Sequence, residues 1–268
     1  MRVAFIKMHG LGNDFVVLDS REAELPPVTE QFARAIADRR TGIGCDQLIL
    51  LERSERADLA MRIFNADGGE VESCGNATRA IGLMLGKPVA IETSGGLLQV
   101  SPEGANISVT FEPPRLEWDA IPLAYAMDTL SMPVGWEELQ NPAAVNVGNP
   151  HAIFFVDDAE AVDLARLGPL IEHDPLFPQR VNVNIAAVRD GAIDLRVWER
   201  GVGETRACGT GASATAIAAI RRGLVASPVE VRLKGGTLVI GWDGRGSFTM
   251  SGAAAESFRG TFEWSDFA

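Results

Sequence analysis

The chain has 268 residues, which is long enough for two domains of ordinary size, each with its own hydrophobic core. Hydrophobic residues make up 46% and charged residues 22%, so the composition is that of a globular protein and excludes a disordered one. The formal net charge of -12 argues against a nucleic acid or an anionic membrane surface as the main partner, although a local pocket can still bind a small carboxylate.

The predicted elements are mostly short strands. Apolar or β-branched runs bounded by Gly, Pro, Asn and Asp predict strands, and a few longer runs with helical spacing predict helices. In chain order we expect strands at 3–8 and 14–19, a helix near 29–39, strands at 47–52 and 59–65, a helix near 76–86, strands at 89–93, 97–101, 106–111 and 152–156, a helix near 161–172, strands at 181–188 and 193–198, a helix near 210–223, and strands at 229–233, 237–242 and 246–250. This order favours an α+β fold.

The N-terminus and the cysteines limit the class of protein further. The first residues, MRVAFIKMHGLGNDF, lack the long apolar segment of a signal peptide, and no apolar run approaches the roughly 20 residues that span a bilayer. Three cysteines and three histidines are scattered without CxxC pairs, so neither a disulfide framework nor a metal site is expected. We therefore expect a cytoplasmic enzyme or binding protein.

The two halves of the chain resemble each other. A proline-rich segment at 111–142 separates them, and we place the boundary near residue 117. The segment MRIFNADGGEVESCGN (61–76) aligns without a gap with LRVWERGVGETRACGT (195–210), and Cys74 then coincides with Cys208.

Two further pairs of segments recur in the same order. GNDFVVLD (12–19) has a counterpart in GNPHAIFFVD (148–157), and TSGGLLQV (93–100) has one in LKGGTLVI (233–240). Three ordered matches indicate a duplicated domain, so the two cysteines are predicted to be pseudo-symmetric partners.

Each cysteine follows a strand and a glycine-containing loop and precedes a helix. The positive end of a helix favours a thiolate and lowers the usual thiol pKa of about 8.5. The exposed N–H groups of the same helix ends form a site for a carboxylate, and the residues predicted to supply them are Gly75, Asn76, Gly209 and Thr210.

Paired thiols at such a site suit proton transfer at a carbon next to a carboxylate. One thiolate removes the proton from one face and one thiol delivers a proton to the other, while the helix ends stabilise the developing charge. The residues alone are also compatible with two other classes of protein. A thiol redox protein could join the cysteines as a disulfide, and a two-lobed amino-acid binding protein would account for the many asparagines.

Several residues have a structural interpretation when taken alone. Cys45 has no counterpart in the repeat and is predicted to be a packed thiol. Arg62 and Arg196 are paired by the repeat and are predicted to form scaffold salt bridges. A single His151, and asparagines beside Gly or Pro, are ordinarily structural or turn residues.

Six blocks along the chain resemble those of the diaminopimelate epimerase family. They are MHGLGNDFVVLD, TGIGCDQLILLE, MRIFNADGGEVESCGN, NVGNPHAIFFVDD, RVNVNIAAV and VWERGVGETRACGTGA, in this order and over nearly the whole length. The resemblance implies a cofactor-independent enzyme that interconverts LL- and meso-diaminopimelate without pyridoxal phosphate or metal, in lysine and peptidoglycan precursor biosynthesis. A related cysteine-pair racemase for another amino acid is the alternative.

The resemblance also implies the fold. It is an α+β fold of two pseudo-symmetric domains, each a mixed β-sheet wrapped around a central helix, with the active site in the cleft between them. We expect an N-terminal domain at 1–117, a C-terminal domain at 118–253, and a strand at 254–268 that packs back on the first domain. A homodimer is a family expectation, with no nucleic acid and no membrane as partners.

The resemblance assigns the site residues one by one. Cys74 and Cys208 are the acid/base pair, and His151 and Glu199 tune the two thiols. Arg200 reads the distal carboxylate of the substrate bidentately. The residues implied to bind substrate are Asn13, Gln47, Asn65, Gly75, Asn76, Asn149, Asn182, Glu199, Arg200, Gly209 and Thr210.

Overall fold

The computed structural model describes residues 1–72, 74–103 and 106–268 and divides into two compact units. Unit 1 contains Met1–Thr110 and Gly252–Ala268, and unit 2 contains Phe111–Ser251. The sequence predicted domain limits at residues 117 and 253. These limits remain a proposal for where two separately folding domains meet.

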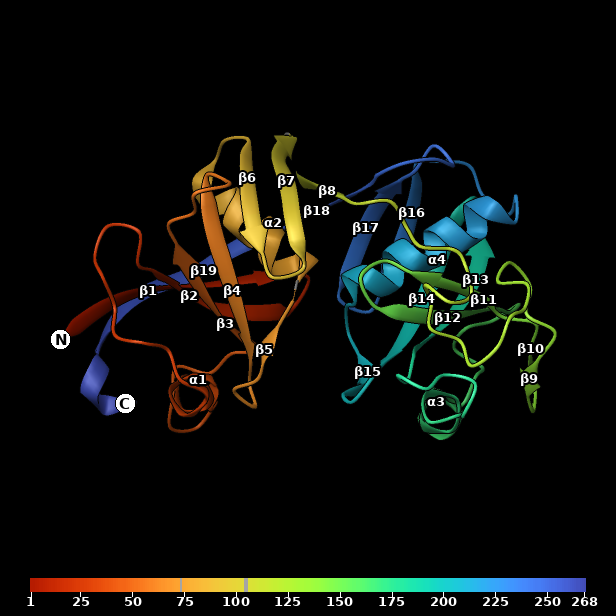
Figure 1. Ribbon diagram of the computed structural model, residues 1–268, viewed down its shortest axis with the longest axis horizontal. Coiled ribbons are helices and arrows are strands. Elements are labelled where there is room, and N and C mark those ends of the chain that lie inside the picture. Colours follow the sequence, from red (N-terminus) through yellow and green to blue (C-terminus); the bar gives the residue numbers. More distant parts are fainter. Residues whose placement is uncertain (73, 104–105) are drawn as a thin grey trace. The chain divides into compact units, whose positions relative to one another are not determined.

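Unit 1 consists of strands around one buried helix, with a second helix on the outside (Figure 1). Helix α2 packs against β1, β7 and β19, whereas α1 packs against β3 and β4. The elements are β1 (Arg2–Gly10), β2 (Asn13–Asp19), α1 (Glu30–Ala37), β3 (Gln47–Glu52), β4 (Leu59–Asn65), β5 (Glu70–Val71), α2 (Gly75–Leu85), β6 (Val89–Thr93), β7 (Gly96–Glu103), β8 (Asn106–Phe111), β19 (Ala255–Glu263) and a 3₁₀ turn at Trp264–Asp266.

Unit 2 repeats this plan. Helix α4 packs against β11, β12, β13, β14, β16 and β17, and α3 packs against β13, β14 and β15. The elements are β9 (Gly135–Trp136), β10 (Leu139–Gln140), β11 (Ala143–Asn146), β12 (Pro150–Phe155), α3 (Leu164–Glu172), β13 (Asn182–Arg189), β14 (Ala192–Glu199), β15 (Gly203–Thr205), α4 (Gly209–Arg221), β16 (Val229–Leu233), β17 (Gly236–Gly241) and β18 (Phe248–Gly252).

The strand pairings confirm the internal repeat. β2 runs parallel to β3 with Phe15 opposite Gln47, and β12 runs parallel to β13 with His151 opposite Asn182. The pairs β4 with β6 and β14 with β16 are also parallel, and the pairs β3 with β4 and β13 with β14 are antiparallel. Each unit is therefore a mixed sheet built in the same order around a central helix, as the resemblance implied.

Small residues allow most of each central helix to be buried. In α2 a side chain at position 82 would place its Cβ 2.4 Å from Val100 Cγ1, so only glycine fits this close approach. In α4 the run from Ala212 to Ala219 is buried and consists mainly of alanine. Helices that are buried over most of their surface are expected at the centre of a domain.

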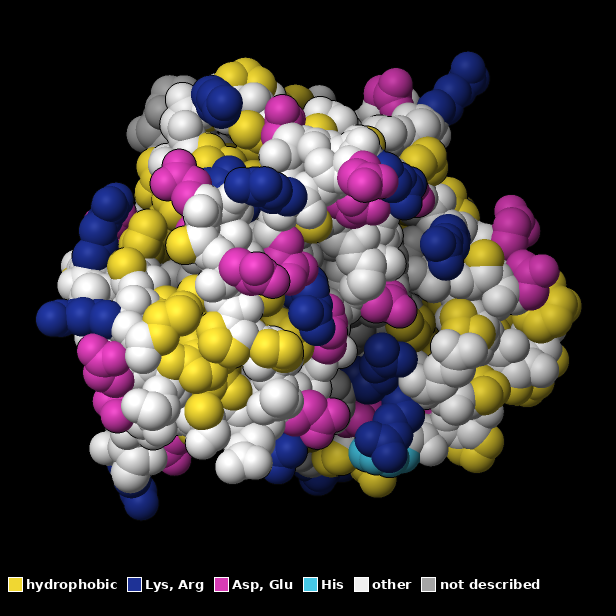
Figure 2. Space-filling view, turned by 60° about the vertical axis from the view of Figure 1, so that its left-hand side comes forward, with side chains coloured by type: hydrophobic (Ala, Val, Ile, Leu, Met, Phe, Trp, Pro, Cys, Tyr) yellow, Lys and Arg dark blue, Asp and Glu magenta, His cyan; other side chains and the backbone are white. Residues whose placement is uncertain are grey.

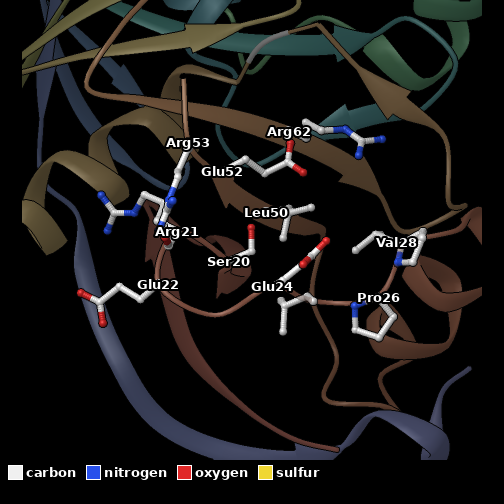
Figure 3. A pocket seen from close by; sticks show the side chains of 12 residues that line it. Ser20, Arg21, Glu22, Glu24, Pro26, Val28, Leu50, Glu52, Arg53 and Arg62 are labelled. Atoms are coloured by element: carbon white, nitrogen blue, oxygen red, sulfur yellow. Dashed lines mark hydrogen bonds between the residues drawn. The ribbon is translucent and has the colours of Figure 1, made fainter. Parts of the chain in front are cut away.

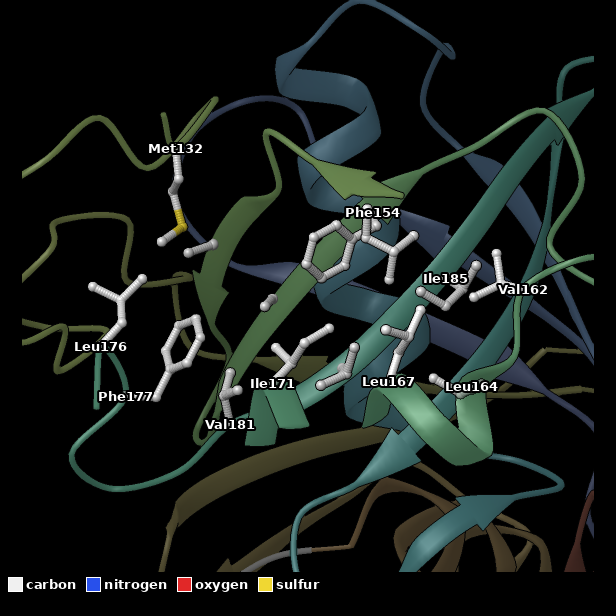
Figure 4. Close-up of a cluster of buried hydrophobic side chains, with 14 of the residues drawn as sticks. Met132, Phe154, Val162, Leu164, Leu167, Ile171, Leu176, Phe177, Val181 and Ile185 are labelled. Atoms are coloured by element: carbon white, nitrogen blue, oxygen red, sulfur yellow. The ribbon is translucent and has the colours of Figure 1, made fainter. Parts of the chain in front are cut away.

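The second helix of each unit covers an apolar cluster. In unit 2, Leu164, Leu167 and Ile171 project from α3 toward Ile185 of β13, and Phe154 of β12 lies in the same cluster (Figure 4). Asp163 caps α3 by accepting a hydrogen bond from the Arg166 N–H. Burial of such side chains stabilises each unit by about 1.5–3 kcal/mol per residue.

Every predicted strand and helix has an observed counterpart, and the predictions missed the short strands β5, β9, β10, β11 and β15. The two-residue strands β5, β9 and β10 are too short to show an alternating pattern. β19 pairs antiparallel with β1, with Val3 opposite Phe262, so the C-terminal segment completes unit 1. Both chain ends lie at the same end of this unit, where Trp264 N–H donates to Met1 O (Figure 1).

The surface carries many ion pairs despite the acidic net charge. Figure 2 shows basic side chains beside acidic ones over the face in view. Arg21 lies 2.6 Å from Asp19, and Arg259 lies 2.7 Å from Glu256. Exposed pairs of this kind contribute at most about 1 kcal/mol each. Among the helices of the described residues, none has the length and hydropathy needed to cross a membrane.

Candidate active site

Cys74 is the residue that starts helix α2. It has extended backbone angles (φ -146°, ψ 108°), and the helix begins at the next residue, Gly75. Its sulfur lies 3.7 Å from Asn13 Oδ1, which also accepts a hydrogen bond of 3.2 Å from Asn76 Nδ2. Unit 1 therefore brings together the predicted catalytic thiol and two of the predicted substrate ligands.

Asn13 is held in place by a charged cluster. Its Nδ2 donates to Asp46 Oδ2 at 3.1 Å, and Arg39 donates to the carboxylates of both Asp46 and Asp14 at 2.7 and 2.6 Å. Lys7 also donates to Asp14. These cations hold the pKa of Asp14 well below its usual range, although burial acts in the opposite direction and is the largest single influence. The cluster fixes which end of the Asn13 amide faces Cys74.

A buried cation lies on the other side of Asn76. Arg79 has no exposed surface and donates to Asn76 Oδ1 at 2.8 Å. Burial lowers the pKa of Arg79 to about 10, and negative charge on Cys74 raises it. Arg79 therefore stays protonated at neutral pH and favours a thiolate at Cys74.

Gln47 and Asn65 face each other across β3 and β4. Gln47 Nε2 donates to Asn65 Oδ1 at 2.9 Å, and Gln47 Oε1 is buried without a hydrogen-bond partner among the described residues. Such an acceptor lacks the donor that buried polar atoms normally have. It is suited to receive a donor from a ligand.

Cys208 starts helix α4 in the same way. Its backbone is extended (φ -125°, ψ 109°), and its sulfur accepts a hydrogen bond of 3.4 Å from the Gly211 N–H. Thr210 Oγ1 lies 3.5 Å from the same sulfur. Both cysteines therefore occupy the helix starts at which the repeat placed them.

The pKa of Cys208 differs from the expectation. The helix start was expected to lower it, whereas burial of the thiol raises it well above its usual value, and the negative charge of Glu199 raises it further. The hydrogen bonds from Thr210 and Gly211 act in the lowering direction and do not prevail. The side chain is almost fully enclosed, so desolvation of the charged form outweighs the helix dipole. Cys208 is protonated at neutral pH.

Glu199 ends strand β14 and is oriented by the next strand. Thr205 Oγ1 donates to Glu199 Oε1 at 2.5 Å, and the antiparallel pairing of β14 with β15 brings the two residues together. This hydrogen bond keeps one carboxylate oxygen occupied. Glu199 and Cys208, the thiol whose pKa it raises, thus both belong to unit 2.

His151 is fully buried on β12, and its ring contacts two amides. Nε2 lies 2.9 Å from Asn149 Oδ1, and Nδ1 lies 3.1 Å from Asn184 Nδ2. Burial lowers the pKa of His151 to about 3, and the positive charge of Arg200 acts in the same direction. The imidazole is therefore neutral at physiological pH.

Asn182 connects the strands of unit 2, and Arg200 follows directly after β14. Asn182 Nδ2 donates to Pro150 O at 3.0 Å, and Asn182 Oδ1 accepts from the Arg200 N–H at 2.9 Å. The exposed guanidinium of Arg200 donates to Gln179 O at 2.8 Å. Asn182 thereby positions the backbone from which Arg200 projects.

Sequence reasoning missed the residues that hold these groups in place. Asp46 orients Asn13, Arg79 orients Asn76, Thr205 orients Glu199 and Asn184 contacts His151. Asn184 carried a usable signal, because it is a polar residue between the apolar residues Val183 and Ile185 of β13. The other three are ordinary polar residues in sequence.

The structural interpretations of Cys45 and of the two repeated arginines are confirmed. Cys45 is buried in the apolar cluster of unit 1, and burial raises its pKa to about 11. Arg62 donates to Glu70 at 2.9 and 2.8 Å, and Arg196 donates to Glu204 at 3.0 and 3.1 Å. An equivalent bidentate Arg–Glu ion pair therefore links the two strands of the equivalent hairpin in each unit, β4–β5 in unit 1 and β14–β15 in unit 2.

A surface groove of unit 1 lies apart from the predicted site residues. Figure 3 shows Glu24 and Glu52 with Arg21, Arg53 and Arg62 around apolar side chains. None of the predicted substrate ligands lines it. Across residues 1–72, 74–103 and 106–268, no group of three or more His, Cys, Asp or Glu is placed to hold a metal ion.

Solved structures with the same fold include a hydroxyproline epimerase and a phenazine biosynthesis protein. A hydroxyproline epimerase from Agrobacterium vitis with bound trans-4-hydroxy-L-proline superimposes with a TM-score of 0.67 at 18% identity, covering 97% of this chain and 91% of that one. A phenazine biosynthesis protein of the PhzF family from Enterococcus faecalis gives a TM-score of 0.70 at 17% identity, covering 98% and 100%. At these identities the likeness shows the fold.

Sequence comparisons are more specific. A diaminopimelate epimerase from Erythrobacter litoralis (strain HTCC2594) is 64% identical over 269 residues, covering 100% of both chains. One from Sphingopyxis alaskensis (strain DSM 13593 / LMG 18877 / RB2256) is 61% identical and covers 98% of each. The sequence model of the diaminopimelate epimerase family matches residues 5–116 and 143–256. With both repeats matched and close relatives along its whole length, the chain belongs to the diaminopimelate epimerase family.

Proposed function

We propose that the protein interconverts LL- and meso-diaminopimelate, with Cys74 and Cys208 as base and acid on opposite faces of one α-carbon. The observation that carries this proposal is the pair of thiols at the starts of two equivalent buried helices. Each helix start also offers the N–H groups of its first turn to a carboxylate. The family to which the chain belongs supports the choice of substrate.

The protonation states of the two thiols follow from their surroundings. Burial and Glu199 keep Cys208 as a thiol, and the buried Arg79 cation favours a thiolate at Cys74. The Cys74 thiolate takes the α-proton of one epimer and becomes a thiol. The Cys208 thiol gives its proton to the opposite face and becomes a thiolate. The reverse reaction exchanges these roles, and no electrons are gained or lost.

The remaining predicted residues are proposed to bind and orient the substrate. Gly75, Asn76, Gly209 and Thr210 hold the reacting carboxylate at the two helix starts, where charge develops in the transition state. Glu199 sets the pKa of Cys208, and His151 acts on the thiols through its neighbours. The proposed ligands of the rest of the substrate are Asn13, Gln47, Asn65, Asn149, Asn182, Glu199 and Arg200.

We also propose the setting in which the enzyme works. It acts in the cytoplasm, in lysine and peptidoglycan precursor biosynthesis, as a homodimer without nucleic acid or membrane partners. The acidic net charge of -12 supports the last point. Light scattering on the purified protein measures the mass directly, and a monomer at all concentrations overturns the homodimer.

Proton exchange with solvent tests the proposed reaction. The reduced protein is incubated with LL-diaminopimelate in deuterated water, and product and substrate are followed by NMR and mass spectrometry. We expect meso product that carries deuterium at the inverted carbon, because the delivered proton comes from a thiol that exchanges with solvent. Absence of both exchange and product under reducing conditions overturns the epimerase. Exchange with proline and none with diaminopimelate favours a related racemase.

Arg200→Lys tests recognition of the distal carboxylate. We expect KM for diaminopimelate to rise roughly tenfold or more with a smaller change in kcat, because lysine cannot supply the bidentate fork. Steady-state kinetics measures both constants. Arg180→Lys is the matched control, since Arg180 is an exposed arginine of the same unit and lies 3.6 Å from the buried carboxylate of Glu172. Equal kinetics for the two variants contradict the assigned contact.

A further inference from the structure

Unit 2 buries two polar side chains where unit 1 has apolar ones. His151 and Asn184 have no exposed surface. In the sheet register His151 corresponds to Phe15, since they lie opposite Asn182 and Gln47 respectively, and Asn184 therefore corresponds to Ile49. Phe15 and Ile49 are fully buried too.

The repeat shows that this position in the sheet does not need polar residues to fold. An apolar pair contributes its burial directly, whereas buried amide and imidazole groups lose their hydration and must be compensated by hydrogen bonds. A buried polar pair at one of two equivalent positions therefore points to a task that is specific to unit 2.

The orientation of the Asn184 amide is fixed by the backbone. Its Nδ2 lies 3.1 Å from Ala152 O as well as 3.1 Å from His151 Nδ1. The opposite orientation would place the amide oxygen against a carbonyl oxygen, so the N–H groups must face His151. His151 Nδ1 is then an acceptor, and the ring proton of the neutral imidazole is on Nε2.

The proton on Nε2 decides how Asn149 is oriented. Nε2 lies 2.9 Å from Asn149 Oδ1 and donates to it. With the oxygen turned toward the imidazole, the N–H₂ group of Asn149 points away from the ring and can donate to a ligand. A ligand atom that contacts it must be an acceptor, such as a carboxylate oxygen, rather than an ammonium.

The other end of Asn184 faces the start of α4. Asn184 Oδ1 is buried without a hydrogen-bond partner in the described part of the chain. A Cβ at position 211 would lie 2.8 Å from this oxygen and 3.3 Å from Cys208 Sγ. Asn184 therefore lies between His151 and the turn that carries the predicted catalytic thiol.

We propose that Asn184 is a positioning residue that holds His151 as the neutral Nε2–H tautomer, so that Asn149 presents hydrogen-bond donors to a substrate carboxylate. The inference rests on the proposed function in so far as Asn149 is a substrate ligand. The low pKa of His151, about 3, agrees with an imidazole that is neutral throughout the physiological range.

The test combines the tautomer of His151 with kinetics in two variants. Asn184→Ile copies the residue found in unit 1, and Asn184→Asp places a carboxylate next to Nδ1. Nitrogen-15 NMR of ring-labelled histidine identifies the tautomer, and comparison with His151→Gln assigns its signals. We expect the Nε2–H form in the unmodified protein, a mixture of tautomers in Asn184→Ile and the Nδ1–H form in Asn184→Asp.

The kinetic prediction concerns the amide of Asn149, which should rotate when the tautomer of His151 changes. In both variants KM for diaminopimelate should rise more than kcat falls, with kcat/KM lower by roughly tenfold to a hundredfold, because a donor aimed at a carboxylate is lost. Thr215→Val is the matched control, since its hydroxyl is also buried without a partner in the described residues. This control should keep both the tautomer and the kinetics of the unmodified protein.

Three results overturn the proposal. They are an Nδ1–H tautomer in the unmodified protein, an unchanged tautomer in Asn184→Asp, and a fall in kcat at constant KM. The first needs no variant of Asn184, so the proposal can fail even if the Asn184 variants do not fold. The tautomer is measured without substrate, and therefore loss of the proposed function, seen as no solvent exchange in the unmodified protein, is distinguished from failure of this inference.

Discussion

Replacing either Cys74 or Cys208 by alanine is expected to lower the epimerisation rate at least about a thousandfold, because general acid and base steps typically contribute factors of this size. The two variants should differ from an inactive protein in one respect. The remaining thiol can still exchange a proton from its own face, so slow deuterium uptake should be confined to one configuration of the α-carbon. Chiral separation of the substrate followed by mass spectrometry measures this.

Cys45→Ala is the control for loss of a thiol. It removes a buried sulfur from the core of unit 1 and should reduce stability by about 1–2 kcal/mol with little effect on kcat. Cys208→Ala removes an acceptor for the Gly211 N–H, and thermal unfolding should show a loss of about 1 kcal/mol. Deuterium uptake in both configurations by both single variants contradicts the two-base assignment.

The positions of the two thiols could be predicted because they depend on local sequence. A strand, a glycine loop and a helix follow one another within a few residues, and the repeat supplied the same order twice. An N-cap residue is fixed by its neighbours in the chain. Cys74 and Cys208 thus occupy the helix starts that were predicted without knowledge of the fold.

The pKa of Cys208 could not be predicted in this way. The helix dipole is a local effect and was expected to dominate, whereas desolvation depends on everything packed around α4. Glu199 adds its charge from the end of β14, nine residues earlier in sequence and brought near by the β15 hairpin. A sequence motif can therefore predict where a catalytic thiol lies, but it cannot predict the protonation state of that thiol.

The anchoring residues were missed for a related reason. Asp46 contacts Asn13 across 33 residues, and Asn184 contacts His151 across 33 residues. Such contacts depend on the parallel pairing of strands that are distant in sequence. The repeat could have suggested Asn184, since aligning it with Ile49 exposes a polar residue at a core position.

The duplicated fold is symmetric in topology and asymmetric in chemistry. Asn13 contacts Cys74 directly, whereas its counterpart Asn149 is engaged by His151. Arg79 favours negative charge at one helix start, and Glu199 opposes it at the other. The proposed reaction needs one thiolate and one thiol, and the surroundings of the two cysteines differ in the direction that this proposal requires.

Glu199→Gln should separate the pKa of Cys208 from its part in catalysis. Because the charge of Glu199 raises the pKa of Cys208, the neutral amide should lower it, and a larger fraction of thiolate should form at a given pH. Alkylation of Cys208 by iodoacetamide should therefore become faster, whereas epimerisation should slow by roughly a hundredfold because the carboxylate no longer assists the thiol. Peptide mass spectrometry across pH measures the first quantity and steady-state kinetics the second.

Thermal unfolding makes this test specific. A variant that merely loosens unit 2 would expose Cys208 and, because burial is the main cause of the raised pKa of this thiol, would speed alkylation as well. It would also lower the unfolding temperature, whereas Glu199→Gln acting through its charge should leave that temperature nearly unchanged. Glu204→Gln is the matched control, because Glu204 lies in the same hairpin and pairs instead with Arg196 and Lys234 at 3.0 and 2.8 Å. It should leave the pH dependence of Cys208 unchanged. If Glu199→Gln leaves it unchanged as well, burial alone keeps Cys208 protonated and the carboxylate acts elsewhere in the reaction.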